Sequence, residues 1–186
     1  MSRTTTVSMI INGVQTDPVE VPEDLMLLEF LHEYLNLTGT RYGCGQGVCR
    51  ACSVIYDGGE TGAEVLPACI TGVAWANGRR FRTVEGHAKR GPEGEIATIT
   101  PVQQAFLDHF SFQCSYCTPG FVAAAQALVE RLEAEPVAIN RVEDVVLEAL
   151  NENICRCTGY VRYLEATRDV ILATPGLTRT PEAGES

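Results

Sequence analysis

Long hydrophobic runs are absent from this sequence of 186 residues. A membrane-spanning helix needs roughly 20 consecutive apolar residues, and no stretch approaches that length. The first residues, MSRTTTVSMIING, contain a lone Arg3 and neither a twin arginine nor the apolar centre of a secretory signal. We therefore expect neither a membrane span nor an export signal in this chain.

Positive charge is also scarce. The chain has 14 Lys and Arg against 24 Asp and Glu, which gives a formal net charge of −10. The resulting field repels nucleic acid and anionic membrane surfaces, so neither is expected as a partner. The hydrophobic content of 45% is enough to form the core of one domain or of two small ones.

Histidine is rare as well. His32, His87 and His109 are scattered along the chain, and none stands in a C-x-H pairing. They therefore do not suggest the mixed His and Cys ligation of Rieske-type centres. We expect them to be ordinary surface or helix-face residues.

Cysteine, in contrast, is plentiful, with eight residues in the chain. Without an export signal, this number favours metal or redox chemistry over a disulfide framework. The cysteines fall into two groups separated by a long gap: Cys44, Cys49, Cys52 and Cys69, and then Cys114, Cys117, Cys155 and Cys157. Two sites of four ligands each are the simplest interpretation.

The first half of the chain has the pattern of a mixed domain. Residues 5–20 alternate apolar and polar side chains around Asn12 and Gly13, a strong signal for a β-hairpin. Leucines at helical spacing in residues 22–39 predict an amphipathic helix that ends near Gly39. Short β-rich segments follow the cysteine loop. Residues 1–84 are therefore expected to form an α+β domain with a grasp-like arrangement.

The second half has the pattern of a helical domain. Residues 85–97 are rich in Gly, Pro and charge, which is typical of a linker. Beyond them, Thr100 with Gln103 predicts a capping box, and three further helical patterns follow. We expect an all-α four-helix bundle in residues 98–174 and a loose C-terminal tail in residues 175–186.

The first cysteine group has the spacing of a plant-type iron–sulfur site. CGQGVCRAC is a C-x4-C-x2-C run, and Cys69 follows it. A cluster held by four thiolates is anionic and needs backbone N–H groups directed at its sulfurs. The small residues Gly43, Gly45, Gly47 and Ala51 would permit such a wrap. The alternative is structural zinc, which favours pairs of C-x2-C knuckles.

The second group is less specific by itself, because QCSYC with CRC also suits zinc. Its cysteines precede two predicted helix starts, at Thr118 and near Tyr160. Helix N-termini supply unpaired N–H groups and the positive end of the helix dipole. We therefore expect the two thiols of the C-x-C pair, Cys155 and Cys157, to serve one metal centre across a bundle.

Four motifs, GCGQGVCRACSV, LPACI, QCSYCTPG and NICRCTGY, occur in this order. Over nearly its full length the chain resembles the small iron–sulfur subunit of the molybdenum hydroxylases, the group that includes xanthine dehydrogenase, aldehyde oxidoreductase and carbon monoxide dehydrogenase. The resemblance implies a plant-type ferredoxin-like, β-grasp domain with one [2Fe–2S] cluster on Cys44, Cys49, Cys52 and Cys69. It also implies a four-helix domain with a second cluster on Cys114, Cys117, Cys155 and Cys157.

The resemblance further implies partners. A large subunit would hold a molybdopterin cofactor beside the second cluster, and electrons would pass to the first cluster and then to a flavin or cytochrome subunit. Gln113 matches the family glutamine that contacts the pterin, and Cys157 lies where a ligand cysteine approaches it. From the residue alone, capping of a turn is the favoured role of Gln113, and the resemblance reverses this preference.

Two residues depart from the family pattern. Arg50 stands where the family usually has Gly, and Glu152 stands where a small residue is usual. A solvated Arg50 is the simpler interpretation, and a role in tuning the first cluster or in meeting a partner is the alternative. The run from Arg79 to Arg82 is expected to be a solvated strand end, with a partner contact as its alternative.

The predicted function is that of an electron-transfer subunit of a molybdenum-dependent oxidoreductase, with no substrate site of its own. The partner would hydroxylate an aldehyde, a purine or an N-heterocycle. The alternatives are a free-standing two-cluster electron carrier and a zinc-stabilised interaction module. We expect a cytoplasmic protein, or a periplasmic one if a partner with a signal carries it across the membrane.

Overall fold

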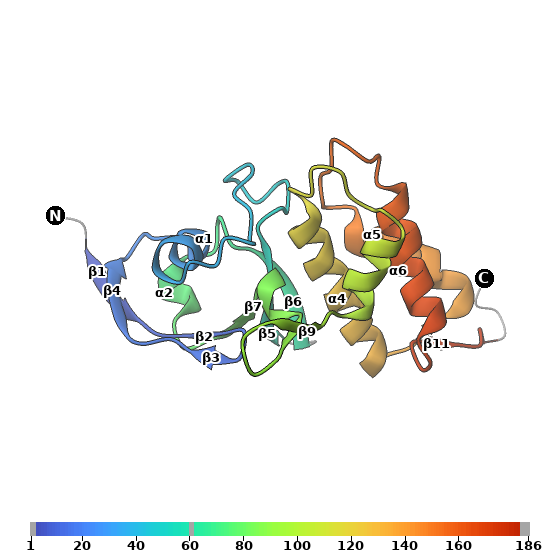
Figure 1. The fold of residues 1–186 in the computed structure, drawn as a ribbon, viewed down its shortest axis with the longest axis horizontal. Coiled ribbons are helices and arrows are strands. Elements are labelled where there is room, and N and C mark those ends of the chain that lie inside the picture. Colours follow the sequence, from blue (N-terminus) through green and yellow to red (C-terminus); the bar gives the residue numbers. More distant parts are fainter. Residues whose placement is uncertain (1–2, 60–61, 183–186) are drawn as a thin grey trace.

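The computed structural model describes residues 3–59 and 62–182, and it combines sheet and helix as expected. Strands dominate the N-terminal half and helices dominate the C-terminal half, and the two halves lie side by side (Figure 1). Each half has its own core of buried side chains. Within the described residues, no helix is long and apolar enough to cross a membrane.

The main sheet of the N-terminal half combines strands that precede the cysteine loop in the sequence with strands that follow it. Its spatial order is β3 (Val14–Gln15), β2 (Ile10–Ile11), β7 (Arg80–Arg82), β5 (Ser53–Gly59) and β6 (Gly62–Pro67). Asn12 and Gly13 form the predicted hairpin turn, with φ of 53° and 81°. The flanking segments leave this sheet and pair separately, as β1 (Thr4–Val7) with β4 (Val19–Pro22).

The helix predicted over residues 22–39 is much shorter than expected. The structure has α1 (Leu27–Glu29), which continues as a π-helical turn, η1 (Phe30–Tyr34). Asn36 then takes φ of 54°, a left-handed conformation that stops the helix before Gly39. The leucine spacing therefore reflects burial of one face of a short helical segment, residues 27–34. A second short helix, α2 (Val73–Ala76), lies in a segment that was predicted to be extended.

The C-terminal half contains α3 (Pro101–Asp108), α4 (Thr118–Ala134), α5 (Val142–Leu150) and α6 (Val161–Ala173). The capping box is confirmed, because Thr100 Oγ1 accepts from the Gln103 N–H and Gln103 accepts from the Thr100 N–H. In the core, the Phe121 and Tyr163 rings stack with centroids 4.0 Å apart. Packing of these rings joins α4 to α6.

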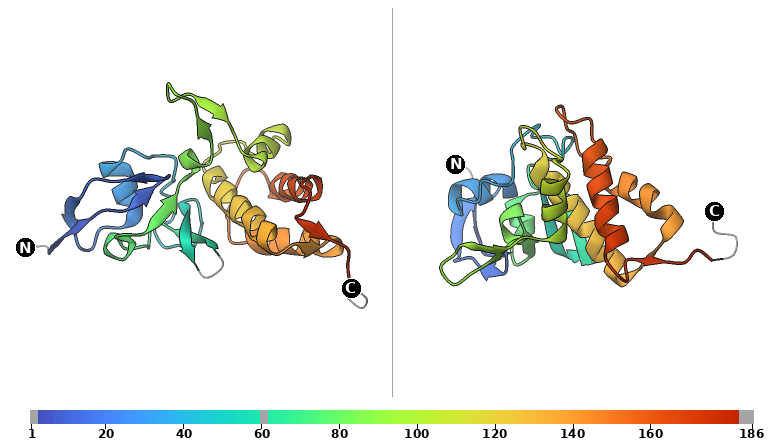
Figure 2. Two further views of the ribbon diagram at one scale, coloured as in Figure 1. Left: turned by 90° about the horizontal axis from the view of Figure 1, so that it is seen from below. Right: turned by 45° about the vertical axis from the view of Figure 1, so that its right-hand side comes forward.

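Residues 85–97, predicted as a linker, contain regular structure. A 3-10 turn, η2 (Val84–Gly86), leads into a hairpin of β8 (Lys89–Arg90) and β9 (Ile96–Thr98). This hairpin projects from the body of the molecule (Figure 2, left, yellow-green). Every residue of its strands is exposed, so it contributes no core.

The start of the predicted loose tail is anchored. The short strand β11 (Thr178–Arg179) pairs in parallel with β10 (Val137–Ala138), which leads into the 3-10 turn η3 (Ile139–Arg141). Leu177 is 1% exposed within the helical core. The remainder of the tail, residues 183–186, lies outside the described residues.

Helix α4 joins the two halves. It packs against β5 and β6, where Ile55 meets Ala123 and Ala127. Small alanine side chains allow the helix backbone to lie close to the sheet. The Arg82 guanidinium spans the same interface and forms 2.7 Å hydrogen bonds to both carboxylate oxygens of Glu130 and a 2.6 Å bond to Asp57 Oδ1.

Two expectations about single residues are wrong. Arg80 is exposed as predicted, but Arg79 is only partly exposed, with its guanidinium 4.2 Å from the centre of the Trp75 ring, and Arg82 is half-buried in an ion pair between the halves. His87 is 8% exposed and is not a surface residue. Burial, followed by the nearby Arg82 charge, lowers the pKa of His87 to about 4. Sequence periodicity could not find either contact, because both depend on how the halves dock.

Candidate metal centres

The first group of cysteines lies in the loop between η1 and β5, together with Cys69 after β6. Cys44 is directed towards Cys49, and Cys52 towards Cys69, so the thiols form two pairs. Backbone N–H groups of Gln46 and Cys49 donate to Cys44 Sγ at 3.3 and 3.4 Å. The Gly47 N–H donates to Cys69 Sγ at 3.4 Å. The loop therefore surrounds sulfur atoms with donors, as an anionic centre requires.

Thiolate character follows from these contacts. The backbone hydrogen bonds from Cys49 and Gln46 lower the pKa of Cys44 to about 6. Burial raises the pKa of Cys52 to about 12, so this thiol needs a bound cation to become a ligand. Cys44 of one pair is thus prepared as thiolate, whereas Cys52 of the other pair is held in apolar surroundings.

Glycine is required where the loop wraps closest. A Cβ at Gly43 would lie 2.7 Å from Cys49 Sγ, inside the cysteine cradle. Gly47 takes φ of 73°, and in this conformation its N–H reaches Cys69. Both positions therefore require glycine for a geometric reason, as the sequence of the loop predicts.

The second group joins two loops of the helical half. Cys114 and Cys117 precede α4, and Cys155 and Cys157 precede α6. Cys157 Sγ lies 3.5 Å from Cys114 Sγ, and the side chains of Cys117 and Cys155 contact each other. The two thiols of the C-x-C motif therefore contact different cysteines: Cys157 pairs with Cys114, and Cys155 pairs with Cys117.

The two pairs of the second group differ in exposure. Cys117 and Cys155 are 8% and 6% exposed, whereas Cys114 and Cys157 are exposed at the surface. Burial raises the pKa of Cys117 to about 12. Burial acts in the same sense on Cys155, but hydrogen bonds from the Thr158 hydroxyl and N–H outweigh it and lower its pKa. Within the buried pair, Cys155 is therefore the thiol that is stabilised for ligation.

The pairing fits a two-iron centre. A [2Fe–2S] cluster takes two ligands on each iron, and each cysteine group supplies two pairs together with N–H or hydroxyl donors to sulfur. In residues 3–59 and 62–182, no three or more His, Cys, Asp or Glu side chains are arranged around a point that would hold a single ion.

Gln113 is exposed and adjoins the exposed pair of the second group. Large apolar side chains close in sequence to Cys114 or Cys157 are also exposed: Phe110 (73%), Tyr116 (49%), Tyr160 (38%) and Val161 (56%). Exposed apolar side chains next to a candidate site suggest a surface that another protein covers. The contact predicted for Gln113 involves a group outside this chain and stays a prediction.

The two cysteine loops contact each other, which the sequence did not predict. Arg50 and Glu152, noted separately as departures, form an ion pair. Beside it, the Ile154 N–H donates to the Cys49 carbonyl oxygen at 3.1 Å. The sequence does contain a positive charge next to Cys49 and a negative charge three residues before Cys155. These two residues are about a hundred positions apart, so the sequence alone does not indicate that they pair.

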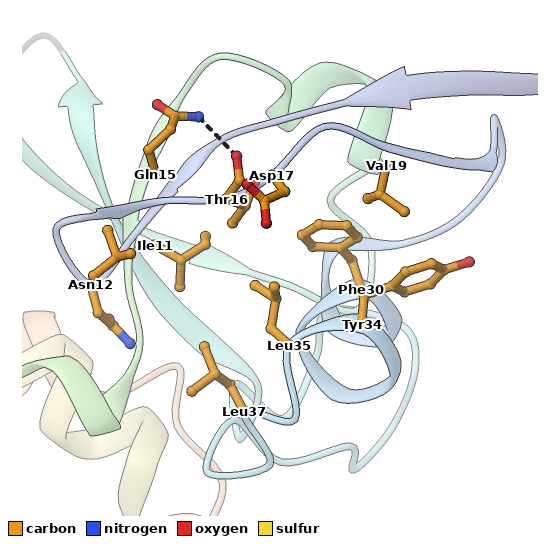
Figure 3. Close-up of a pocket in the computed structure, with 11 residues that line it drawn as sticks. Ile11, Asn12, Gln15, Thr16, Asp17, Val19, Phe30, Tyr34, Leu35 and Leu37 are labelled. Atoms are coloured by element: carbon orange, nitrogen blue, oxygen red, sulfur yellow. Dashed lines mark hydrogen bonds between the residues drawn. The ribbon is translucent and has the colours of Figure 1, made fainter. Parts of the chain in front are cut away.

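A separate hollow of about 500 Å³ lies between η1 and the β2–β3 hairpin. Its lining is largely apolar and includes Ile11, Phe30 and Leu35 (Figure 3). Among the described residues that line it, Asp17 is the only carboxylate, and none is a cysteine or a histidine. The hollow is therefore separate from both cysteine groups and offers no metal ligands of their kind.

Two protein-family models match the chain. The 2Fe-2S iron-sulfur cluster binding domain matches residues 9–74, and the [2Fe-2S] binding domain matches residues 83–168. Each match contains one of the two cysteine groups. The family models therefore support one [2Fe–2S] site in each half.

Similar proteins cover most of the chain. One of the subunits of nicotinate dehydrogenase from Pseudomonas putida is 39% identical over 88% of this chain and 93% of that protein. The xanthine dehydrogenase iron-sulfur-binding subunit of Escherichia coli O157:H7 is 34% identical over 90% of this chain and 95% of that protein. The crystal structure of quinoline 2-oxidoreductase from Pseudomonas putida 86 superposes with a TM-score of 0.73 at 32% identity, covering 90% of this chain and 93% of that one.

Proposed function

The chain belongs to the [2Fe–2S] subunits of the molybdenum hydroxylase family, and from this premise we propose that it relays electrons from a molybdopterin site on a larger partner subunit to a flavin or cytochrome acceptor. The chain itself would hold no substrate. The partner would hydroxylate an aldehyde, a purine or an N-heterocycle. The chain is thus a component of an oxidoreductase complex.

The observation that carries this proposal is the presence of two paired-thiol groups in one chain. Cys44, Cys49, Cys52 and Cys69 would hold one cluster, and Cys114, Cys117, Cys155 and Cys157 would hold the other. Each bound cluster would accept and release one electron at a time. The N–H groups of Gln46, Gly47 and Cys49 stabilise the thiolates, and the Cys49–Ile154 hydrogen bond links the two loops.

We propose a direction for the relay from the difference in exposure. The exposed pair Cys114 and Cys157, with Gln113 beside it, would face the molybdopterin subunit. The Gln113 amide can donate and accept hydrogen bonds at once, which suits a pterin edge. The apolar side chains at this face would be buried against that subunit. The first group would then be the exit towards the flavin or cytochrome partner.

The proposed domain plan follows the sequence prediction. Residues 1–84 would form a β-grasp domain of plant-type ferredoxin kind and residues 98–174 a four-helix domain, with residues 85–97 between them. We propose a cytoplasmic complex, with co-export by a signal-bearing partner as the alternative.

The test is metal and sulfide analysis of anaerobically purified protein. We expect about four iron and about four acid-labile sulfide per chain, because each [2Fe–2S] cluster contains two of each. Stoichiometric zinc without sulfide would overturn the proposal in favour of a zinc-stabilised module. Purification without any large molybdopterin protein would instead favour a free-standing electron carrier.

A further inference from the structure

We propose that Arg50 and Glu152 are positioning residues, which clamp the first cysteine loop to the loop before Cys155 and so preserve the Cys49–Ile154 hydrogen bond. The inference deepens the proposed function, because that bond connects the two cysteine groups. It rests on the contacts between residues 49–50 and residues 152–154.

The first step is the position of the bond itself. Cys49 belongs to the first cysteine group, and its carbonyl oxygen accepts from Ile154 at 3.1 Å. Ile154 is bonded directly to Cys155 of the second group. The path between the groups therefore crosses one hydrogen bond between main-chain atoms. A second link, from the Tyr116 hydroxyl to the Tyr42 carbonyl, starts two residues before Cys44 and follows a longer path.

The second step is the strain at residue 50. Arg50 takes φ of 59°, a left-handed conformation that costs a residue with a Cβ but not glycine. Any residue with a side chain at position 50 is therefore less stable in this backbone conformation than glycine would be. The Arg50 guanidinium pairs with Glu152, whose carboxylate lies two residues before Ile154. The arginine thus adds a contact between the loops that glycine could not make.

The third step concerns the stability that the Arg50–Glu152 ion pair contributes. The Arg50 and Glu152 side chains are 22% and 63% exposed, and pairs so exposed contribute little to global stability. Removing the pair should therefore leave the fold intact. Its effect should be local, on how often the hydrogen bond between the adjacent main-chain segments opens.

The experiment measures amide hydrogen exchange in a peptide that contains Ile154, using the full chain as purified. The variants are Glu152→Gln, Arg50→Gly, the pair Arg50→Gln with Glu152→Gln, and the charge swap Arg50→Glu with Glu152→Arg. The paired glutamine variant keeps the net charge of the native chain. Arg50→Gly removes the side chain and places at position 50 a residue that adopts positive φ without strain. Arg41→Gln is a control that removes an exposed charge from the same loop.

We expect exchange about two- to fivefold faster in both single variants and in the paired glutamine variant, the range that corresponds to a weak ion pair. The charge swap should return to the native rate, and Arg41→Gln should not differ from it. In cluster-loaded protein, freeze-quench EPR after a limiting dose of dithionite should show electrons distributing between the two clusters more slowly in the same variants, with recovery in the swap.

If the paired glutamine variant exchanged the Ile154 amide at the native rate, the clamp would be refuted. A shift in the reduction potential of the first cluster in the single variants would not rescue it, because the two charges would then act only electrostatically. A swap that exchanges as fast as the paired glutamine variant would overturn it as well. Absence of iron and sulfide from native protein would refute the proposed function, whereas the exchange measurement would still decide whether the clamp exists.

Discussion

The carbonyl oxygen of Arg50 occupies the space beside Gly120 that a Cβ would need, at 2.1 Å from the position of that atom. Gly120 lies in the first turn of α4, directly after the Cys117 loop, and it is buried. The close approach of these two backbones is where the first cysteine loop and the helical half meet.

Gly120→Ala should therefore destabilise the protein, although alanine is the better helix former. The gain in helix propensity is up to about 1 kcal/mol. Overpacking against the Arg50 backbone costs roughly 1–3 kcal/mol, so the net effect should be a loss of up to about 2 kcal/mol. Chemical unfolding of the loaded chain measures it. Gly72→Ala, where no atom lies within 4 Å of the new Cβ, is the control and should be neutral. Equal stability of the two variants would contradict the packing argument.

Arg82→Gln should weaken the docking of α4 on the sheet. Arg82 satisfies two carboxylates, and its loss leaves Glu130 half-buried without its cation. Partial burial of the pair suggests a loss of about 1–3 kcal/mol, between the values for exposed and for fully buried pairs. The double variant with Glu130→Gln should recover part of this loss, because the charge of Glu130 is removed together with its cation and only the more exposed Asp57 stays without its partner. Unfolding free energies of the three variants give the comparison, and strict additivity would argue against the pair.

Acid should destabilise the protein through His87. Its pKa is lowered to about 4 in the folded state, below the roughly 6.5 of an unfolded histidine. The unfolded chain therefore binds a proton between these values while the folded chain does not. The stability contributed by neutral His87 is complete above pH 6.5 and is lost as the pH falls towards 4, by up to about 3 kcal/mol.

His87→Met should flatten this pH dependence. Methionine fills the buried site without titrating, and in the described residues no hydrogen-bond partner of His87 Nε2 is lost. The comparison is the unfolding free energy at pH 7 and at pH 5 for the native chain and the variant. His109→Gln, which changes a more exposed histidine, is the control. An equal acid sensitivity in His87→Met would assign the effect to other groups.

Gln113→Ala should lower retention of the molybdopterin cofactor in the assembled complex while both cluster spectra stay intact. Losing a hydrogen bond of ordinary strength costs about 0.5–1.5 kcal/mol, or roughly a two- to tenfold weakening. Molybdenum content and turnover of the purified complex are the measurements. Gln104→Ala, on the exposed face of α3, serves as the matched control. Full molybdenum content together with full turnover would remove the support for this contact.

The order of the relay can be tested by removing ligands. Cys52→Ala should abolish the first cluster only, so substrate should still reduce the second one in the assembled complex. Cys155→Ala should prevent substrate from reducing either cluster. EPR after substrate addition distinguishes these outcomes, provided that iron analysis first shows about half of the native content. Normal acceptor turnover in Cys155→Ala would reverse the proposed order.

Local features of this chain could be predicted from sequence because their causes are local. The turn at Asn12 and Gly13, the capping box at Thr100 and the start of α4 after Cys117 each depend on a few neighbouring residues. The grouping of the cysteines was equally clear from spacing. The division of each group into pairs was not, because it depends on how separate loops meet.

What escaped prediction depends on contacts between the halves. The sequence identified Arg50 and Glu152 as unusual but could not pair them, because no spacing rule connects distant loops. His87 and Arg82 lie in a polar segment that is typical of a surface, yet α4 covers them. The long helix expected up to Gly39 failed for another reason: burial of consecutive leucines produces the same spacing in a short turn.

Helix α4 gives the molecule a mechanical property. Near its start the Gly120 backbone lies against the Arg50 carbonyl oxygen of the first cysteine loop, and near its end Glu130 is held by Arg82 on the sheet. At a rise of 1.5 Å per residue, these two points lie about 15 Å apart on one rigid rod. A hinge needs a single pivot, whereas this rod is fastened near both ends. A rotation of one half against the other would therefore have to break one of the fastenings or bend the helix, so thermal motion should leave the spacing between the two cysteine groups nearly constant.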